Sequence, residues 1–418
     1  MFIDKKGYCI LIIIILLISQ NGFARKKVES SKSETIEDII KAERDEYSYK
    51  IGFIRIIPQF KIGIYYDSNV LSSNINRVSD IVAEAGPALT EKIGIGNFAL
   101  FKSYQYFSYV YYRDLENLRH YLHNINLSLI TGRRSFIINA EAGSSKGIVR
   151  PTTEADIPAN QLLRYYKATA KIPLFHRFVM YLFYNRNEYS FEDYYNYYSK
   201  SINEALRRRE NIFSIEASLK LTAKTRIFFR TNKEVFDFVY EPIIRDYNGS
   251  QYEWGIEISG SSFFAGFVKL GYYQLIPKNP DYKSFKGLVI NTMLEYKPIE
   301  VVKLKFNVIR KPQFSVFYSI NDHYVQNQFS IDLIWTLTGK QAAVIGFMLG
   351  RNVYAEPHFV SPEVKLKDDY KEGRISYIYK LRKDLYLENG LSYFNRDANY
   401  ELFKRKRLMF FINLRYSL

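Results

Sequence analysis

From about residue 50 to the C-terminus, apolar and polar residues alternate with a period of two in short segments. In the last segment, Leu408, Phe410 and Ile412 fall on one face, and Asn413 and Arg415 fall on the other. Successive side chains of a strand point to opposite faces, so the pattern predicts strands with one apolar face. The same pattern recurs at residues 210–222, 248–259, 283–296 and 323–336. Alternation over about 9–11 residues is the length that a tilted strand needs to cross a bilayer.

The links between these segments alternate in length along the chain. Tight links are expected at 94–97, 132–133, 173–176, 223–224, 260–261, 298, 337–340 and 382–383. Longer polar links are expected at 67–79, 113–118, 147–160, 190–207, 240–247, 276–282, 312–321, 354–367 and 397–401. Bacterial outer-membrane barrels have short periplasmic turns, long outer loops and an even strand number. We therefore predict an all-β fold: a closed transmembrane antiparallel β-barrel of about 18 strands, with both termini periplasmic. The alternative is about 16 strands, because the segments near Pro87 and Phe101 are poorly phased.

Composition agrees with a membrane barrel and excludes helical spans. The chain has 37 Tyr and 31 Phe, yet its mean hydropathy is slightly negative. In a barrel one face of each strand meets lipid and the other meets water, and aromatic residues girdle both interfaces. Beyond residue 24, no run of about 18 apolar residues exists, which a spanning helix would need.

The N-terminus has the order of a secretory signal. Lys5 and Lys6 precede the apolar run 8–18, and the small residues Gly22 and Ala24 follow. The run is too short for a spanning helix of about 20 residues, so we predict a signal peptide at 1–24; a retained anchor is the alternative. Cys9, the single cysteine, lies inside this signal, so the mature chain has neither a disulfide nor a catalytic thiol.

Residues 25–48 are predicted to be a periplasmic N-terminal segment, followed by the barrel at 49–418. Thr35 and Asp38 have capping-box spacing, and Ile36 and Ile39 share one side, which indicates a short helix. A plain periplasmic tail is the first interpretation of this segment. A plug or a partner-docking helix is the second.

The formal net charge of +16 favours acidic partners. Because the chain is exported, no nucleic acid is expected. Outer-membrane lipids and lipopolysaccharide fit the compartment, and anionic glycans are a further candidate. Tyr416 and Leu418 supply a hydrophobic C-terminal pattern for the barrel-assembly machinery.

One segment carries a family resemblance. Residues 58–70 read PQFKIGIYYDSNV, and Ser79-Asp80-Ile81 and Pro87 follow. This order is similar to the opening of the Putative beta-barrel porin families of Gram-negative bacteria, in which a Tyr-Asp-x-Asn turn precedes a Ser-Asp pair. The resemblance covers roughly 40 residues and implies a barrel in the bacterial outer membrane, encoded in some relatives near exopolysaccharide genes, with no catalytic residues. The chain departs from many barrels by ending in Leu418 rather than Phe.

The turn motif of Asp67, Asn69 and Asp80 lies where the first strand ends. Short Asp and Asn side chains bond to their own backbone and set turns, which is our interpretation. A calcium site is the alternative, but three oxygen ligands are too few for calcium.

The remaining candidates for chemistry are weak, so no metal site, cofactor or enzyme activity is predicted. His120 and His123 are three residues apart on a strand and therefore point to opposite faces. His323 beside Asp322 is the one adjacent His–carboxylate pair, at the start of a strand. A membrane-embedded hydrolase needs a nucleophile and base near the rim, and this pattern does not supply them.

The lumen is the surface on which a function is predicted. The expected pore-lining cations are Lys220, Arg230, Lys269, Lys303, Lys305, Arg374, Lys380, Arg396 and Arg415. The expected acids on the same face are Glu216, Glu234, Glu253, Glu257, Glu295, Asp332 and Glu388. Ion pairs could link the strands across an interior filled by side chains, or an excess of basic residues could line an anion-selecting channel. We predict a porin-like channel or export conduit for anionic or saccharide solutes, with no chemical step; a plugged structural barrel is the alternative.

Overall fold

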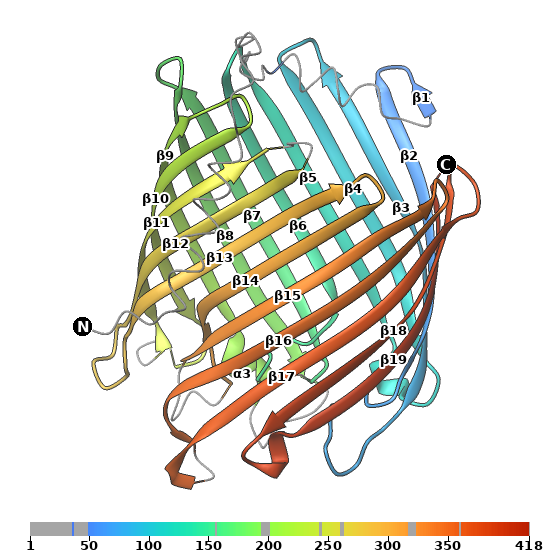
Figure 1. Cartoon of the computed structure of the whole chain (residues 1–418), viewed down its shortest axis with the longest axis vertical. Coiled ribbons are helices and arrows are strands. Elements are labelled where there is room, and N and C mark those ends of the chain that lie inside the picture. Colours follow the sequence, from blue (N-terminus) through green and yellow to red (C-terminus); the bar gives the residue numbers. More distant parts are fainter. Residues whose placement is uncertain are drawn as a thin grey trace. The chain divides into compact units, whose positions relative to one another are not determined.

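The computed structural model describes residues 36, 49–154, 157–193, 201–241, 245–259, 263–316, 323–358 and 361–417. The chain divides into Met1–Ser33 and Glu34–Leu418, and all described residues belong to the second unit. In that unit the strands β2 to β19 pair with their sequence neighbours, and β19 pairs with β2. The sheet is therefore a closed antiparallel ring of 18 strands (Figure 1).

The strands are long enough to cross a bilayer when tilted. They are β2 (Ile54–Asp67), β3 (Asp80–Ile95), β4 (Ala99–Tyr112), β5 (His120–Arg133), β6 (Phe136–Val149), β7 (Ala159–Pro173), β8 (Phe178–Asp193), β9 (Arg208–Lys220), β10 (Thr225–Phe238), β11 (Tyr247–Ile258), β12 (Phe264–Pro277), β13 (Phe285–Ile299), β14 (Val302–Phe314), β15 (His323–Thr338), β16 (Gln341–His358), β17 (Ser361–Lys380), β18 (Leu385–Ala398) and β19 (Arg405–Ser417). A short strand β1 (Tyr49–Ile51) pairs with the start of β2. The helical elements are η1 (Glu116–Leu118), α3 (Ile202–Leu206) and η2 (Glu401–Phe403).

The predicted strand number is confirmed, and the two poorly phased segments are the regular strands β3 and β4. One predicted feature is wrong. The stretch 354–367 was expected to be a long link, but β16 and β17 continue as a ladder in which Pro357 pairs with Lys365 and His358 with Ser361. Register irregularities after Val353 accommodate this extension, which a period-two pattern does not reveal.

The two ends of the barrel differ in the length of their links. At one end, called here the short-link rim, residues 134–135 join β5 to β6 and residues 300–301 join β13 to β14. At the other end, the long-link rim, residues 68–79 join β2 to β3 and residues 194–207, which include α3, join β8 to β9. In Figure 1 the C-terminus lies at the short-link rim and α3 at the long-link rim. Among the described residues, none of the helices has the length and apolar character that a transmembrane helix requires.

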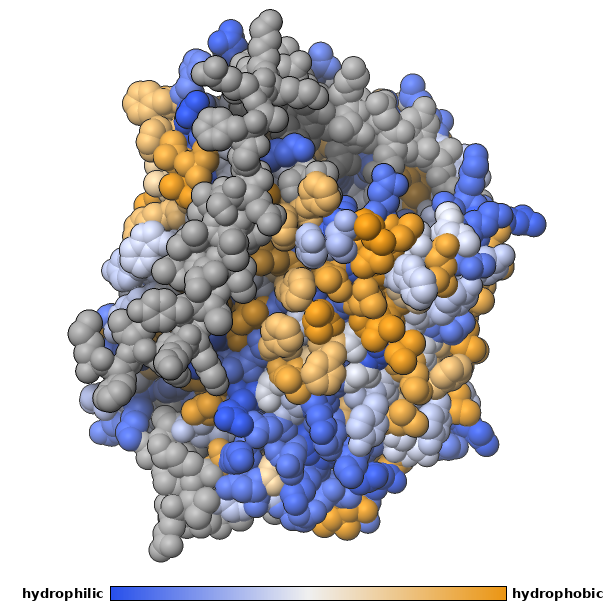
Figure 2. All heavy atoms as spheres, in the orientation of Figure 1, coloured by the Kyte–Doolittle hydropathy of each residue, from blue (hydrophilic) through white to orange (hydrophobic). Residues whose placement is uncertain are grey.

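The outward face of the barrel is apolar between the two rims. Trp254 is 61% exposed and Ile345 and Phe410 are also exposed, each at an outward position of its strand. Figure 2 shows hydrophobic residues gathered across the middle of one face and hydrophilic residues toward the long-link rim. This distribution suits a bilayer, because a Lys or Arg facing lipid at mid-membrane costs about 2–4 kcal/mol.

The predicted signal peptide and most of the predicted N-terminal segment lie outside the described residues. Ile36 is the exception: its side chain is buried against Leu100 and Ile137, both on the inner wall. Its backbone N–H donates to the carbonyl of Arg134, at a short link. This part of the N-terminal segment therefore reaches the inner wall near the short-link rim.

Candidate functional site

The inner wall is built from the polar positions of the alternating strands. On β9–β11 it carries an ion-pair network around Glu216, whose side chain is fully buried. Arg230 donates to one oxygen of Glu216 from Nε, at 2.9 Å, and Arg226 donates to the other oxygen. Arg226 also pairs with Glu257 across the neighbouring strand, at 2.7 Å. Cross-strand pairing of opposite charges holds this part of the wall in one register.

The strand register places every cation of the predicted pore-lining set on the inner face. These are Lys220, Arg230, Lys269, Lys303, Lys305, Arg374, Lys380, Arg396 and Arg415. Several are ion-paired: Lys303 and Lys305 both contact Glu295, at 3.4 and 3.1 Å, and Arg374 contacts Asp332 at 3.0 Å. Much of the inner charge is thus neutralised locally.

A second group of inner cations has no ion-pair partner in the described part of the chain. This group comprises Lys220, Lys269, Lys311, Lys380 and Arg415. Lys380 and Arg415 lie 5.4 and 5.6 Å from the ring centre of Tyr386, and Lys269 lies 4.7 Å from that of Phe267. An aromatic ring attracts a cation but does not neutralise its charge. Lys269, Lys380 and Arg415 can therefore still attract an anion in the lumen.

The described residues of the link between β6 and β7, 150–154 and 157–158, fold into the lumen and are called here the crossing loop. Arg150 anchors its beginning, donating to the carbonyl of Val70 at 2.9 Å and contacting Asp67 at 3.4 Å. Thr153 contacts the hydroxyl of Tyr324 and the amide oxygen of Asn352, each at 3.2 Å. Because β15 and β16 stand on the opposite side of the ring from β6 and β7, the loop spans the lumen.

The crossing loop is fixed to the opposite wall by Glu154, which is fully buried. Its carboxylate accepts hydrogen bonds from the hydroxyl of Ser315, at 2.8 Å, and from the backbone N–H of Val316, at 2.7 Å. Its carbonyl accepts a bond from Arg396, which also pairs with the buried Asp368 at 2.6 Å. Burial raises the pKa of Glu154 to about 7, and the bonds from Val316 and Ser315 and the charge of Arg396 limit the rise.

An apolar cluster lies in the lumen beside this loop at the long-link rim. Ile157 of the crossing loop and Ile202 and Leu206 of α3 pack against aromatic residues at the ends of the surrounding strands. The aromatic members are Phe191, Phe236, Phe238, Tyr247, Tyr273, Phe285, Phe314, Tyr324, Tyr354 and Phe403. The Ser201 side chain caps α3 by accepting from the N–H of Glu204, at 3.1 Å. The cluster narrows this end of the barrel.

Two cavities open on the inner wall on either side of the crossing loop. One, of about 390 Å³, is lined by β9–β14 and contains Arg208, Lys269, Lys311, Glu234 and Tyr273 among its lining residues. The other, of about 350 Å³, is lined by β2–β6, the crossing loop and β19, and contains Glu84, His120, Arg150 and Arg407. Sequence patterning missed Lys311, Arg150 and Glu154, since Lys311 lies close to a strand end and the other two belong to a link.

The predicted turn residues form hydrogen bonds with the backbone. The N–H of Asn69 donates to Asp67 at 2.9 Å, and the Asn69 amide donates to the carbonyls of Ser73 and Lys406. Asp80 accepts a hydrogen bond from the N–H of Leu115 at 2.9 Å. This bond connects the start of β3, after the link 68–79, to the link between β4 and β5. In the described part of the chain, no group of three His, Cys, Asp or Glu residues could hold a metal ion.

The histidines are separated, as their spacing indicates. His120 is buried, with Nδ1 2.8 Å from the carbonyl of Leu118. His123 lies on the other face of β5, with Nε2 3.0 Å from the hydroxyl of Ser144. His323 lies near the ring of Phe285, and Asp322 is outside the described residues.

Comparison with known families identifies the class of protein. A family model described as Putative beta-barrel porin 2 matches residues 47–418, so the chain belongs to this family and is located in the bacterial outer membrane. No curated protein matches the chain.

Solved outer-membrane porins have the same fold. OpdK from Pseudomonas aeruginosa superposes with a TM-score of 0.52 at 8% identity, covering 87% of this chain and 98% of that one. A BenF-like porin from Pseudomonas fluorescens Pf-5 gives 0.53 at 11% identity, covering 88% and 100%. OccAB2 from Acinetobacter baumannii gives 0.52 at 11% identity, covering 88% and 99%.

Proposed function

We propose that the barrel is a constricted channel that conducts small anionic or sugar-like solutes passively across the outer membrane, without a chemical step. The observation that carries the proposal is the pair Lys269 and Lys311, which line one lumen cavity of about 390 Å³. Neither amine has an ion-pair partner among the described residues, so a solute carboxylate or phosphate would provide one. Tyr273, Phe236 and Phe314 line the same cavity and offer rings against which a sugar or an aromatic acid packs.

The crossing loop would set the size limit of this channel. It spans the lumen, whereas a barrel of this strand number without an inserted loop encloses a wide aqueous lumen. The solute would pass beside the loop, along the β9–β14 wall, where the cations are. Selectivity would be modest, because acids such as Glu234 and Glu253 share the wall and salt screens exposed charges beyond about 10 Å at 0.1 M.

The lengths of the links support an orientation for the barrel. We place the short-link rim and both termini in the periplasm and the long-link rim outside the cell, the arrangement general to bacterial barrels. Assembly would use the barrel-assembly machinery acting on the last strand, in which Tyr416 faces outward. Anionic glycans and lipopolysaccharide are the proposed partners outside the cell.

The experiment is a reversal-potential measurement in planar bilayers under a salt gradient. Wild-type protein should show a weak anion preference that fades in concentrated salt. Lys269→Glu with Lys311→Glu should shift the preference toward cations, and Lys303→Glu with Lys305→Glu should act in the same direction, because Glu295 would lose both partners. Vanillate, with which OpdK from Pseudomonas aeruginosa was crystallised, is a suitable anionic probe for liposome swelling.

The matched control is Lys233→Glu with Lys286→Glu, two cations on the outward face of β10 and β13. The same charge change there should leave the ion preference unaltered. Unchanged preference in the Lys269 and Lys311 variant would contradict an anion path along this wall.

A plugged structural barrel is the second candidate, and the apolar cluster at the long-link rim favours it. Well-folded protein that shows no conductance at any pH or voltage would support this candidate over a channel. Its exposed links would then be the functional surface.

A further inference from the structure

A groove of about 810 Å³ lies on the outward face of the barrel, across β13–β18 near the long-link rim. It is called here the rim groove. Its floor contains Ile290, Val308, Phe329 and Leu349, each at an outward position of its strand. A groove with an apolar floor at this height fits a hydrocarbon chain of the surrounding bilayer.

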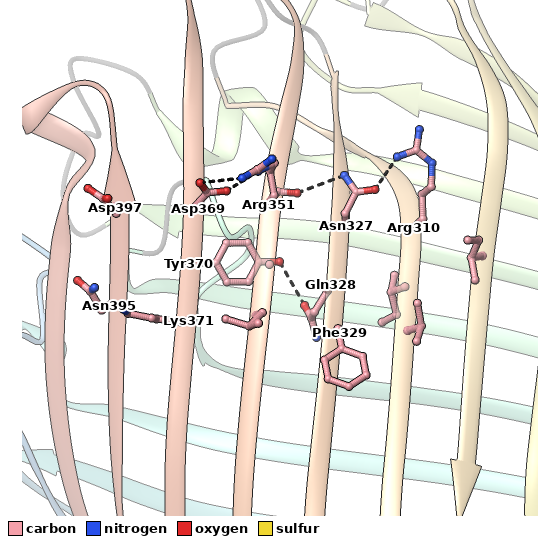
Figure 3. Close-up of a pocket in the computed structure, with 15 residues that line it drawn as sticks. Arg310, Asn327, Gln328, Phe329, Arg351, Asp369, Tyr370, Lys371, Asn395 and Asp397 are labelled. Carbon is pink, nitrogen blue, oxygen red and sulfur yellow. Dashed lines mark hydrogen bonds and ion pairs between the residues drawn. The ribbon is translucent and has the colours of Figure 1, made fainter. Parts of the chain in front are cut away.

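The edge of the rim groove is a row of polar side chains. Figure 3 shows Arg310, Asn327, Arg351 and Asp369 side by side on β14, β15, β16 and β17. Arg310 donates to Asn327 at 2.5 Å, Asn327 donates to the carbonyl of Arg351 at 3.4 Å, and Arg351 pairs with Asp369 at 2.5 Å. The row is therefore preorganised before any ligand arrives.

Some N–H donors in this row take no part in those contacts and can bind a ligand. A guanidinium has five N–H donors, and the hydrogen bonds that Arg310 and Arg351 make within the barrel use two each. Lys371, which also lines the groove, is exposed and makes no ion pair among the described residues. Asn395 adds an amide that can bond to a sugar hydroxyl.

The row lies where the strands leave the hydrocarbon. Arg351 is ten residues from Gln341 at the short-link end of β16, and a tilted strand needs about 9–11 residues to span the membrane. Outward cations recur at this height on other strands, at Arg164, Arg186, Arg209, Lys233 and Lys406. Outward acids also lie near this rim: Asp397 lines the groove itself, and Glu188 pairs with Arg186 and Arg209. Arg164, Lys233 and Lys406 make no ion pair in the described part of the chain and are the cations that would attract anionic headgroups.

We propose that the rim groove binds a phosphorylated glycolipid of the outer leaflet, with phosphate on Arg310, Arg351 and Lys371 and an acyl chain on the apolar floor. Arg and Lys are the side chains suited to phosphate, and Arg binds it with two parallel donors. The amide of Asn395 favours a sugar headgroup over that of a plain phospholipid. The proposal relies on the proposed orientation of the long-link rim toward the cell exterior, and it is independent of conduction.

The test is native mass spectrometry of the full-length mature barrel in detergent, titrated with bisphosphorylated lipid A. Arg310→Gln, Arg351→Gln and Lys371→Gln together should weaken binding of lipid A on the order of tenfold to a hundredfold. The matched control replaces three inner cations instead, by Lys303→Gln, Lys305→Gln and Arg374→Gln, and should bind lipid A like wild type. Heat-modifiable migration on gels checks that both variants are folded.

Two further arms identify the headgroup. Dephosphorylated lipid A should bind as weakly to wild type as lipid A binds to the rim variant, and phosphatidylglycerol should bind more weakly than lipid A. Equal lipid A binding by the rim variant, or equal affinity for phosphatidylglycerol, would overturn the proposal. Conductance of the rim variant should match that of wild type, so failure of the channel proposal would appear separately in the planar bilayer.

Discussion

Asp368 and Asp369 are consecutive on β17, and their carboxylates differ in exposure to solvent because they lie on opposite faces of the barrel wall. Asp368 points inward and pairs with Arg396 at 2.6 Å, with both side chains fully buried. Asp369 points outward and pairs with Arg351 at 2.5 Å, with the side chains 36% and 58% exposed. The two bond lengths are nearly equal, but only the inner pair has lost its water. Distance alone therefore does not set the contribution of an ion pair to stability; the solvent around the pair does.

The largest effect expected from this comparison is that of Asp368→Asn. It would leave Arg396 buried without a counter-charge, which costs about 3–5 kcal/mol of unfolding free energy. Asp369→Asn, its outward neighbour, should cost about 0–1 kcal/mol, because water solvates Arg351. Urea unfolding in detergent, followed by tryptophan fluorescence, measures both. Equal losses in the two variants would show that the inner pair is also solvated.

Glu154 is an inner carboxylate whose charge depends on pH, since burial in the docked loop raises its pKa. Its pKa rises from 4.5 to about 7, so the docked loop holds a proton that the undocked loop releases. Docking is therefore strongest at acidic pH and weakens as pH rises toward 7, by about 3 kcal/mol in total. Arg396, Asp368 and the hydroxyls of Tyr324 and Tyr354 surround the group.

Conductance should accordingly be larger at pH 8 than at pH 5, with the change falling between about pH 4.5 and pH 7. Glu154→Gln should remove this dependence by holding the side chain neutral at every pH. Glu401→Gln, at an exposed carboxylate in another link, should leave it intact. A pH profile that persists in Glu154→Gln would assign the effect to another group.

Two glycines on neighbouring strands probe packing on the two faces. A Cβ on Gly350 would overlap Cζ of Tyr370 on the inner wall, whereas a Cβ on the outward Gly373 would have no atom within 4 Å. Gly350→Ala should displace Tyr370, break its bond with Gln326 and cost about 1–3 kcal/mol. Gly373→Ala should change stability by less than about 0.5 kcal/mol. Detergent melting curves compare them, and similar melting temperatures would mean that Tyr370 moves freely.

The smallest expected effect is that of salt. Raising ionic strength from 0.1 to 1 M shortens the screening length from about 10 to about 3 Å. The small stability difference between wild type and Asp369→Asn should then vanish, while that of Asp368→Asn should persist. The same urea series at two salt concentrations checks this, and a shrinking Asp368 effect would contradict a dry inner pair.

Much of the fold could be predicted because a barrel strand is a local pattern. Alternation placed Leu408, Phe410 and Ile412 on the outward face, and alternating link lengths led to the confirmed ring of 18 strands. The stretch 354–367 was misjudged because its polar composition suggests a loop, although the backbone continues the ladder. Alternation along the strands predicts that Lys269 and Lys303 point inward. It does not predict that Lys303 pairs with Glu295, whereas Lys269 has no ion-pair partner among the described residues.

The sequence by itself determined the period, the strand number and the face to which each side chain points, since neighbouring residues on a strand alternate whatever lies around them. The tertiary structure decided which inner residues meet. Glu154 reaches Ser315, and Arg396 reaches the carbonyl of Glu154, across separations of more than a hundred residues. Those contacts require the ring to close and the crossing loop to fold inward. Because closure brings distant strands together and removes water from between them, it alone distinguishes the buried Asp368 from the solvated Asp369.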